Sequence, residues 1–304
     1  MGPPFFFLSS MRSMKSVSCF CMEIALEYEH YLSIYRQQLT GDEDQDAPWH
    51  YRAQRLHALR VNDALVEVMG AAIILGQSYR GRDATNHLTH GIGRRLKFIW
   101  LSVRSLLAIS PPDRTQPMNS DDVEIVARDL NVIYINIRGA LDNLAAALPS
   151  IFGFTGTVSP MNVDLFKPAY LRRIGAQEID PLLDNFRHWA TDLAARRNPA
   201  AHRIPLSVPP QILNPATRVE YETALNIASK AQAAAFAACR PGHYPEREFA
   251  VARAAHKATE RIGVYSPVFV HHPDEGVQAI YPLVTTDVGN LLAISKLVIA
   301  HLKQ

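Results

Sequence analysis

The chain has 304 residues, of which 48% are hydrophobic and 20% charged, so it carries enough apolar material for a sizeable core. Its 31 basic and 29 acidic residues leave a formal charge of +2, which gives no bulk attraction to nucleic acid or anionic membrane. Three cysteines are too few for a secreted disulfide framework. No apolar run approaches the roughly 18–20 residues of a membrane span, so we expect a cytoplasmic protein without membrane contact.

The N-terminal segment, residues 1–22, differs from the rest of the chain. Its apolar run at 3–8 has no basic residue before it and is too short for a signal peptide. Met11, Met14 and Met22 follow within a few residues. We interpret this segment as a loose tail or an artefact of the start codon, and we expect a single mainly helical domain over residues 23–304.

Apolar residues recur every three or four positions along most of that domain, which is the spacing of one face of a helix. The clearest helix covers 119–148, where Asn119 or Ser120 can cap the start and Pro149 ends it. An acidic loop at 41–46 is expected to close the first helix. In chain order, we expect helices over 23–39, 49–79, 87–109, 119–148, 180–197, 216–239, 246–261 and 287–302.

The amino-acid composition changes near the C-terminus. Residues 264–270 and 277–284 are rich in β-branched and aromatic side chains, and Pro273-Asp274-Glu275-Gly276 lies between them as a turn. We therefore expect a small β-hairpin over about 264–284. The predicted fold class is mainly α, a helical bundle with this hairpin appended.

One basic segment could carry chemistry. Arg197-Asn198-Pro199-Ala200-Ala201-His202 follows the helix that Asp180-Pro181 is expected to begin, and Arg196 and Arg203 flank it. Cleavage of an RNA strand without a metal needs a base for the 2′-hydroxyl proton and a cation for the phosphate charge. Histidine suits the first task and the planar fork of arginine suits the second.

The spacing of arginine and histidine alone is a weak signal, because the chain contains it three times. The matches are Arg52 with His57, Arg82 with His87, and Arg197 with His202. Only the third combines a polar second residue, a preceding amphipathic helix and a local basic cluster. It is therefore the candidate that we carry forward.

Two segments together resemble the HEPN superfamily of helical domains, which have an Arg-polar-x3-His motif. They are residues 136–145, Asn-Ile-Arg-Gly-Ala-Leu-Asp-Asn-Leu-Ala, and residues 197–203, and the resemblance covers about 119–204. Many members are metal-independent ribonucleases. The resemblance implies an RNA-cleaving or RNA-binding homodimer that leaves a cyclic phosphate on its product and uses no cofactor.

The same resemblance assigns roles to individual residues. Arg197 would contact the phosphate, His202 would be the base or its orienting partner, and Asn198 would be the polar second residue. The expected binding residues around them are Arg196, Arg203 and Asp142. The proline at 199 departs from the family pattern, because it should end the helix near Arg197 and leave one short turn behind it.

Other functions fit these residues as well. Arg197 and His202 could simply stabilise a helix end in a non-catalytic scaffold or regulatory protein. His87 and His90 are spaced for a shared metal, but no acidic or cysteine ligand stands at helical spacing beside them, so we expect no metal site. Gly-rich phosphate loops and nucleophile elbows are missing from the sequence, which argues against nucleotide-dependent and hydrolase classes.

Overall fold

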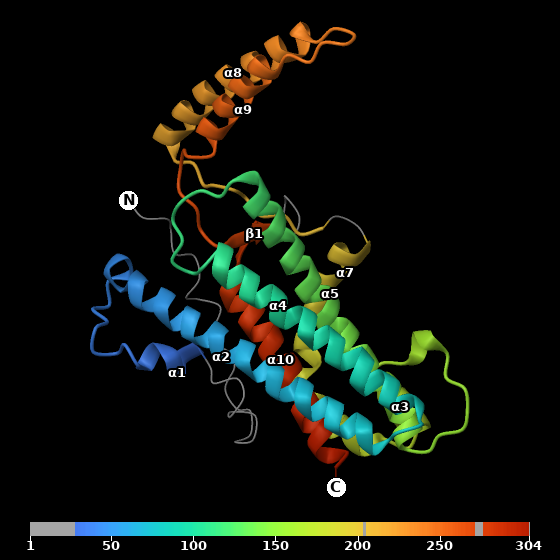
Figure 1. The fold of residues 1–304 in the computed structure, drawn as a ribbon. Helices are drawn as coiled ribbons and strands as arrows, with labels where there is room; N and C mark the ends of the chain where they lie inside the picture. Colours follow the sequence, from blue (N-terminus) through green and yellow to red (C-terminus); the bar gives the residue numbers. More distant parts are fainter. Residues whose placement is uncertain (1–27, 203–204, 271–275, 304) are drawn as a thin grey trace.

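The computed structural model describes residues 28–202, 205–270 and 276–303, with the backbone alone over 199–202. It is mainly α-helical with one antiparallel pair of short strands, which confirms the predicted fold class (Figure 1). The elements, in chain order, are α1 (Tyr28–Ser33), α2 (Glu43–Ser78), α3 (Asp83–Thr85), the π-helix η2 (Asn86–Ile92), α4 (Gly93–Ile109), α5 (Ser120–Ile151), the 3-10 helix η3 (Pro160–Asn162), α6 (Pro168–Arg173), the 3-10 helix η4 (Gln177–Phe186), α7 (Arg187–His202), α8 (Pro215–Ala238), α9 (Glu246–Thr259), β1 (Val268–Val270), β2 (Val277–Ala279) and α10 (Ile280–His301).

The long helices α2, α4, α5 and α10 form the body of the molecule (Figure 1). Their apolar stripes meet in one continuous core, in which Leu65, Leu96, Ile133 and Leu291 are fully buried. Helix α10 contacts α2, α5 and η4. The last helix in the sequence therefore fills the interior, and the earlier helices cover it.

Helix α10 corrects two expectations from the sequence: that no apolar stretch approaches the length of a membrane span, and that the second strand continues to residue 284. Its 22 residues are long and apolar enough to cross a membrane by length and composition alone. Yet 67% of its most apolar window is buried inside the protein, as in the core helix of a bundle. It begins at Ile280, directly after β2, where the sequence predicts that the second strand continues to 284. Pro282 fits the first turn, because the first N–H groups of a helix have no helical partner.

The N-terminal boundaries also differ from the prediction. The residues at 41–46 do not form a closing loop, because Asp42 caps α2 by accepting from the backbone N–H groups of Asp44 and Gln45. Helix α1 is shorter than the predicted 23–39. The tail at 1–22 and the first residues of that predicted helix lie outside the described residues.

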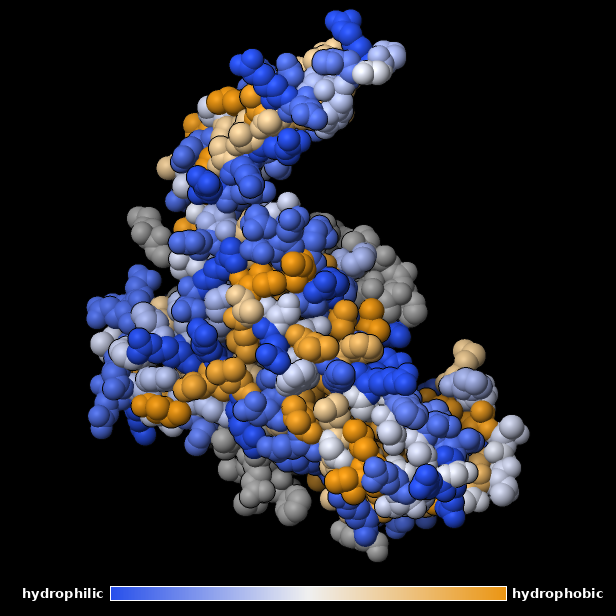
Figure 2. All heavy atoms as spheres, in the orientation of Figure 1, coloured by the Kyte–Doolittle hydropathy of each residue, from blue (hydrophilic) through white to orange (hydrophobic). Residues whose placement is uncertain are grey.

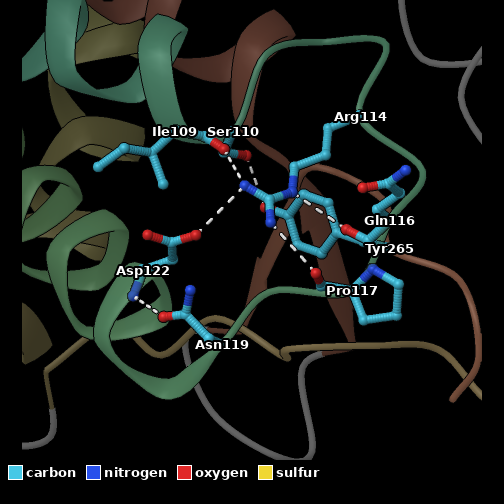
Figure 3. A network of polar contacts seen from close by, with 8 residues as sticks. All are labelled: Ile109, Ser110, Arg114, Gln116, Pro117, Asn119, Asp122 and Tyr265. Carbon is cyan, nitrogen blue, oxygen red and sulfur yellow. Dashed lines mark hydrogen bonds and ion pairs between the residues drawn. The ribbon is translucent and has the colours of Figure 1, made fainter. Parts of the chain in front are cut away.

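Helix α5 forms as predicted from Asn119, whose side chain accepts from the backbone N–H of Asp122. Pro149 does not end it, and the helix continues to Ile151. The loop that precedes α5 is fixed by Arg114, which donates to the carbonyl oxygens of Ile109, Gln116 and Pro117 (Figure 3). This one side chain therefore pairs with three carbonyl groups at the connection between α4 and α5.

The segment before the Arg-Asn-x3-His motif differs from the prediction twice. Asp180-Pro181 does not cap a helix but lies within the 3-10 helix η4, and Arg187 at the start of α7 pairs with both Asp180 and Asp184. Helix α7 does not end near Arg197 but continues through Pro199 to His202. A proline removes a single backbone N–H, so one last turn can continue past it.

Helices α8 and α9 pack on one another and project from the body as a two-helix arm (Figure 1). The side chains buried within these two helices are small: Ala228, Ala235, Ala252 and Thr259. Several large apolar side chains on the arm are instead exposed, and Figure 2 shows hydrophobic patches on it (orange). Whether residues 23–304 fold as a single domain stays a prediction.

Candidate functional site

A cleft of about 670 Å³ opens between the C-terminal half of α5, the loop after α5, and α7. Its apolar wall comes from Ala146 on α5 and from the loop residues Val158, Pro160, Met161 and Val163. The polar side chains that line it are Arg138, Asp142, Asn143, Asp164, Lys167 and Arg197. Three cations and two carboxylates therefore share one open cavity with an apolar side.

Arg138 lines the cleft and joins α5 to the loop that follows it. Its Nε lies 3.0 Å from Asp142 Oδ1 on the next turn of α5, and its Nη2 lies 3.0 Å from Asp164 Oδ2 on the loop. Asp164 also accepts from the backbone N–H of Phe166 at 3.0 Å. These ion pairs and hydrogen bonds hold the loop against α5. The loop residues then form one wall of the cleft.

The pKa of the Asp142 carboxyl group depends on its burial and on the charged groups around it. Burial raises its pKa above the ordinary value, and Asp164 acts in the same direction. Arg138, Arg197 and Arg95 act against that shift. Two separate helices, α4 and α7, thus bring guanidinium groups close enough to influence one carboxylate of α5.

The position of α7 depends on a buried ion pair. Arg196 donates to Asp287 of α10 through Nε (3.0 Å) and Nη2 (2.7 Å), and Trp189 donates to the same carboxylate through Nε1 (2.8 Å). Burial raises the pKa of Asp287 although Arg196 and Trp189 favour its charge. These contacts join the motif helix to the centre of the bundle.

The structure brings two of the predicted site residues together, since Arg197 and Asp142 line the same cleft. Asn198 is exposed, accepts from Arg197 Nη1 at 3.3 Å and is not part of the lining. Arg196 pairs with Asp287 and does not line the cleft either. The side chain of His202, and Arg203 as a whole, lie outside the described residues.

Sequence reasoning missed the contribution of the loop after α5. Asp164 and Lys167 lie in a segment that looks like a plain linker, and no motif marks them. The Arg138–Asp142 pair is visible from its i,i+4 spacing but indicates only a solvated helix face. Only the return of the loop onto α5 makes these residues part of a cavity.

The described residues contain no group of three or more His, Cys, Asp or Glu side chains placed to hold a metal ion. Comparison of the chain with protein-family models, with curated proteins and with solved structures gave no match. The geometry of the cleft is therefore the main basis for a function.

Proposed function

We propose that the protein is a metal-independent endoribonuclease, or an RNA-binding relative of one, that binds a phosphodiester in the cleft between α5 and α7. The observation that carries the proposal is that Arg197, the first residue of the Arg-Asn-x3-His motif, lines a cavity together with Arg138 and Lys167. Guanidinium and ammonium groups are the side chains that bind phosphate oxygens most strongly. The resemblance to HEPN domains leads to the same site.

The composition of the cleft fits a nucleotide better than a bare anion. The cations lie on α5, α7 and the loop end, while Val158, Met161 and Val163 supply an apolar wall that a base can contact. Asp142 and Asp164 already hold Arg138, so they fix its orientation in the cleft. The carboxylates also limit the net positive charge, so affinity for polyanions should be moderate and salt-dependent.

The proposed reaction is transfer of the phosphoryl group to the ribose 2′-oxygen. The 2′-oxygen bonds to phosphorus, the bond to the 5′-oxygen breaks, and a 2′,3′-cyclic phosphate remains. Arg197 stabilises the charge that develops on the phosphate, and the His202 imidazole transfers a proton. No metal ion takes part in this scheme.

A homodimer belongs to the proposal. Residues 197 and 202 are five positions apart on the continuous helix α7, which places their backbone positions about 140° apart around its axis. One copy of α7 therefore presents the two residues in different directions. Two copies that face each other can bring Arg197 of one subunit and His202 of the other to one phosphodiester.

The test incubates the full chain with labelled single-stranded RNA in EDTA. We expect cleavage, and a loss of at least about 100-fold in Arg197→Ala and in His202→Ala. The matched control variants are Arg172→Ala and His188→Ala. Arg172 is exposed on α6 and His188 is exposed on α7, so both variants should cleave RNA like wild type. Intact RNA across diverse sequences, with the fold kept, would refute the proposal.

A second candidate function, that of a non-catalytic scaffold, is favoured by the arm. Val219 (65% exposed), Ile227 (59%) and Val251 (57%) are large apolar side chains left in solvent on a two-helix projection. Such side chains often mark protein contacts. If the arm joins copies of the chain, Ile227→Asp should convert an oligomer to monomers in sedimentation experiments. A wild-type protein that is monomeric at all concentrations would exclude this reading.

A further inference from the structure

The outer face of α4 combines cationic and apolar side chains. The exposed residues of this face are Arg94, Lys97, Phe98, Leu101 and Arg104, and we call them the basic face of α4. At about 100° per residue they lie within roughly 120° of the helix circumference. Figure 2 shows hydrophobic residues (orange) interspersed with hydrophilic ones (blue) on the side of the body to which α4 belongs.

The positive charge of this face is not neutralised by carboxylates of the protein. Helix α4 contains four basic residues and no acidic one. Among the residues that the structure describes, no ion pair involves Arg94, Lys97 or Arg104. On the surface of α8, by contrast, Arg218 pairs with Glu222 at 3.0 Å. The basic face of α4 is therefore suited to an anionic partner.

Two apolar side chains stand among these cations. Phe98 is 51% exposed and Leu101 is 45% exposed, and Ile135 of the neighbouring helix α5 is 37% exposed. An aromatic ring in solvent can stack on a nucleobase while the cations beside it contact the phosphates, and this combination is typical of surfaces that bind single-stranded nucleic acid. A free phosphate ion would use the charges but not the ring.

Helix α4 also connects this face to the cleft. Its Arg95 donates to Asn136 Oδ1 of α5 at 3.3 Å, and a Cβ atom on Gly139 would lie 2.2 Å from Arg95 Nη1. Arg95 also acts to lower the pKa of Asp142, which lines the cleft. Because Arg94 precedes Arg95 in the chain, the basic face of α4 begins within one helical turn of a residue that influences the cleft.

We propose that the basic face of α4 binds the single-stranded segment of an RNA next to the phosphate that lies in the cleft. This inference rests on the proposed function and adds the substrate class, which is single-stranded RNA longer than a dinucleotide. A membrane fits the face less well, because an interfacial helix places a wide apolar face in lipid. The apolar stripe of α4 packs in the core instead, where Leu96, Ile99 and Val103 are buried.

The test measures binding of the full chain to a fluorescein-labelled 2′-O-methyl RNA of about 15 mixed nucleotides by fluorescence anisotropy. The methyl group removes the nucleophile, so binding is measured without cleavage. Arg94→Gln with Lys97→Gln should weaken binding about 10-fold or more, and Phe98→Ala about 5-fold or more. All three side chains are exposed, so urea unfolding of these variants should match wild type.

Matched control variants on the arm separate this face from a general effect of charge or of an exposed ring. Arg247→Gln with Lys257→Gln makes the same change in net charge on α9, where both side chains are exposed. Phe236→Ala removes an exposed ring of α8, which is 60% exposed. Both controls should bind the RNA like wild type.

The salt dependence of binding distinguishes the cations from the ring. Each phosphate contact with a single strand adds about 0.7 to the slope of log Kd against log salt concentration. The variant with Arg94→Gln and Lys97→Gln should therefore lower this slope by about 1.4, for two lost contacts. Phe98→Ala should weaken binding without changing the slope, because stacking releases no counterions.

The outcomes separate this inference from the proposed function. Wild-type affinity in the double variant or in Phe98→Ala overturns the inference, and cleavage of RNA by the wild type in EDTA would then leave the proposed function standing. Loss of binding in both variants, with no cleavage by wild type, refutes the proposed function and supports the RNA-binding face. Binding to phosphatidylcholine–phosphatidylserine vesicles that Phe98→Ala abolishes, with RNA binding unchanged, overturns the inference in favour of a membrane.

Discussion

The buried contact between α7 and α10 gives the sharpest test of how the cleft is held together. Asp287 is fully buried, and Arg196, with a side chain 16% exposed, donates two hydrogen bonds to it. Asp287→Leu removes the carboxylate and leaves a largely buried guanidinium without its counter-charge. Breaking such a pair from one side costs about 3–5 kcal/mol in the free energy of unfolding.

The double variant Asp287→Leu with Arg196→Met measures the net contribution of the ion pair to the free energy of unfolding. Replacing both charges by apolar groups should recover most of the loss, because the desolvation cost of the two ions disappears. The indole N–H of Trp189 then remains unpaired, which costs about 1–3 kcal/mol. We therefore expect the double variant to be more stable than Asp287→Leu and less stable than wild type.

Urea unfolding followed by far-UV circular dichroism measures these differences. A constant slope of stability against urea across the variants would show that the same surface is exposed in each case. Because α7 carries Arg197, binding of RNA should weaken in the single variant and recover in the double variant. A loss below about 1 kcal/mol for Asp287→Leu would refute the view that this pair fixes α7.

Two further variants probe separate features. His57, 6% exposed and stacked on Tyr31, has its pKa lowered to about 4 by burial, so below about pH 6.5 the unfolded chain binds more protons and stability falls with falling pH. From pH 7 to 5, urea unfolding should show a loss of about 2 kcal/mol from this group that is missing in His57→Phe; equal pH dependence in both proteins would contradict it. Gly139→Ala would place a Cβ 2.2 Å from Arg95 Nη1 and displace that guanidinium. NMR titration should then find the pKa of Asp142 raised further, and an unchanged value would show that Arg95 does not act on it.

The helical periodicity of the sequence is enough to predict the bundle. A long amphipathic stretch such as 119–148 is stable as a helix that buries its apolar face against other helices. Two boundaries were wrong because proline was taken as a stop signal, at Pro149 and at Pro199. Pro282 lies in the first turn of α10, where the N–H groups have no helical partner. Pro149 lies in the last turn of α5, and the carbonyl oxygen of Ala145 that it leaves without a helical donor accepts from the Tyr170 hydroxyl at 2.7 Å. The sequence pattern cannot distinguish these positions from a true helix end.

The candidate site was predictable only in part. The Arg-x4-His spacing, together with the amphipathic helix before it and the basic cluster around it, selected Arg197, and Asp142 followed from the resemblance. The hydrogen bond between Asn143, which lines the cleft, and His87 was not predictable, since it depends on a π-helical turn and on a glycine that admits one side chain. Such contacts between distant segments leave no periodic signal in a single sequence.

We propose that the cleft between α5 and α7 cleaves RNA by attack of the 2′-hydroxyl without a metal. Mass spectrometry of the RNA ends produced by the full chain in EDTA tests this most directly. We expect 2′,3′-cyclic phosphate ends that disappear in Arg197→Ala and persist in Arg172→Ala. Ends that carry a 5′-phosphate, or identical products from both variants, would contradict it.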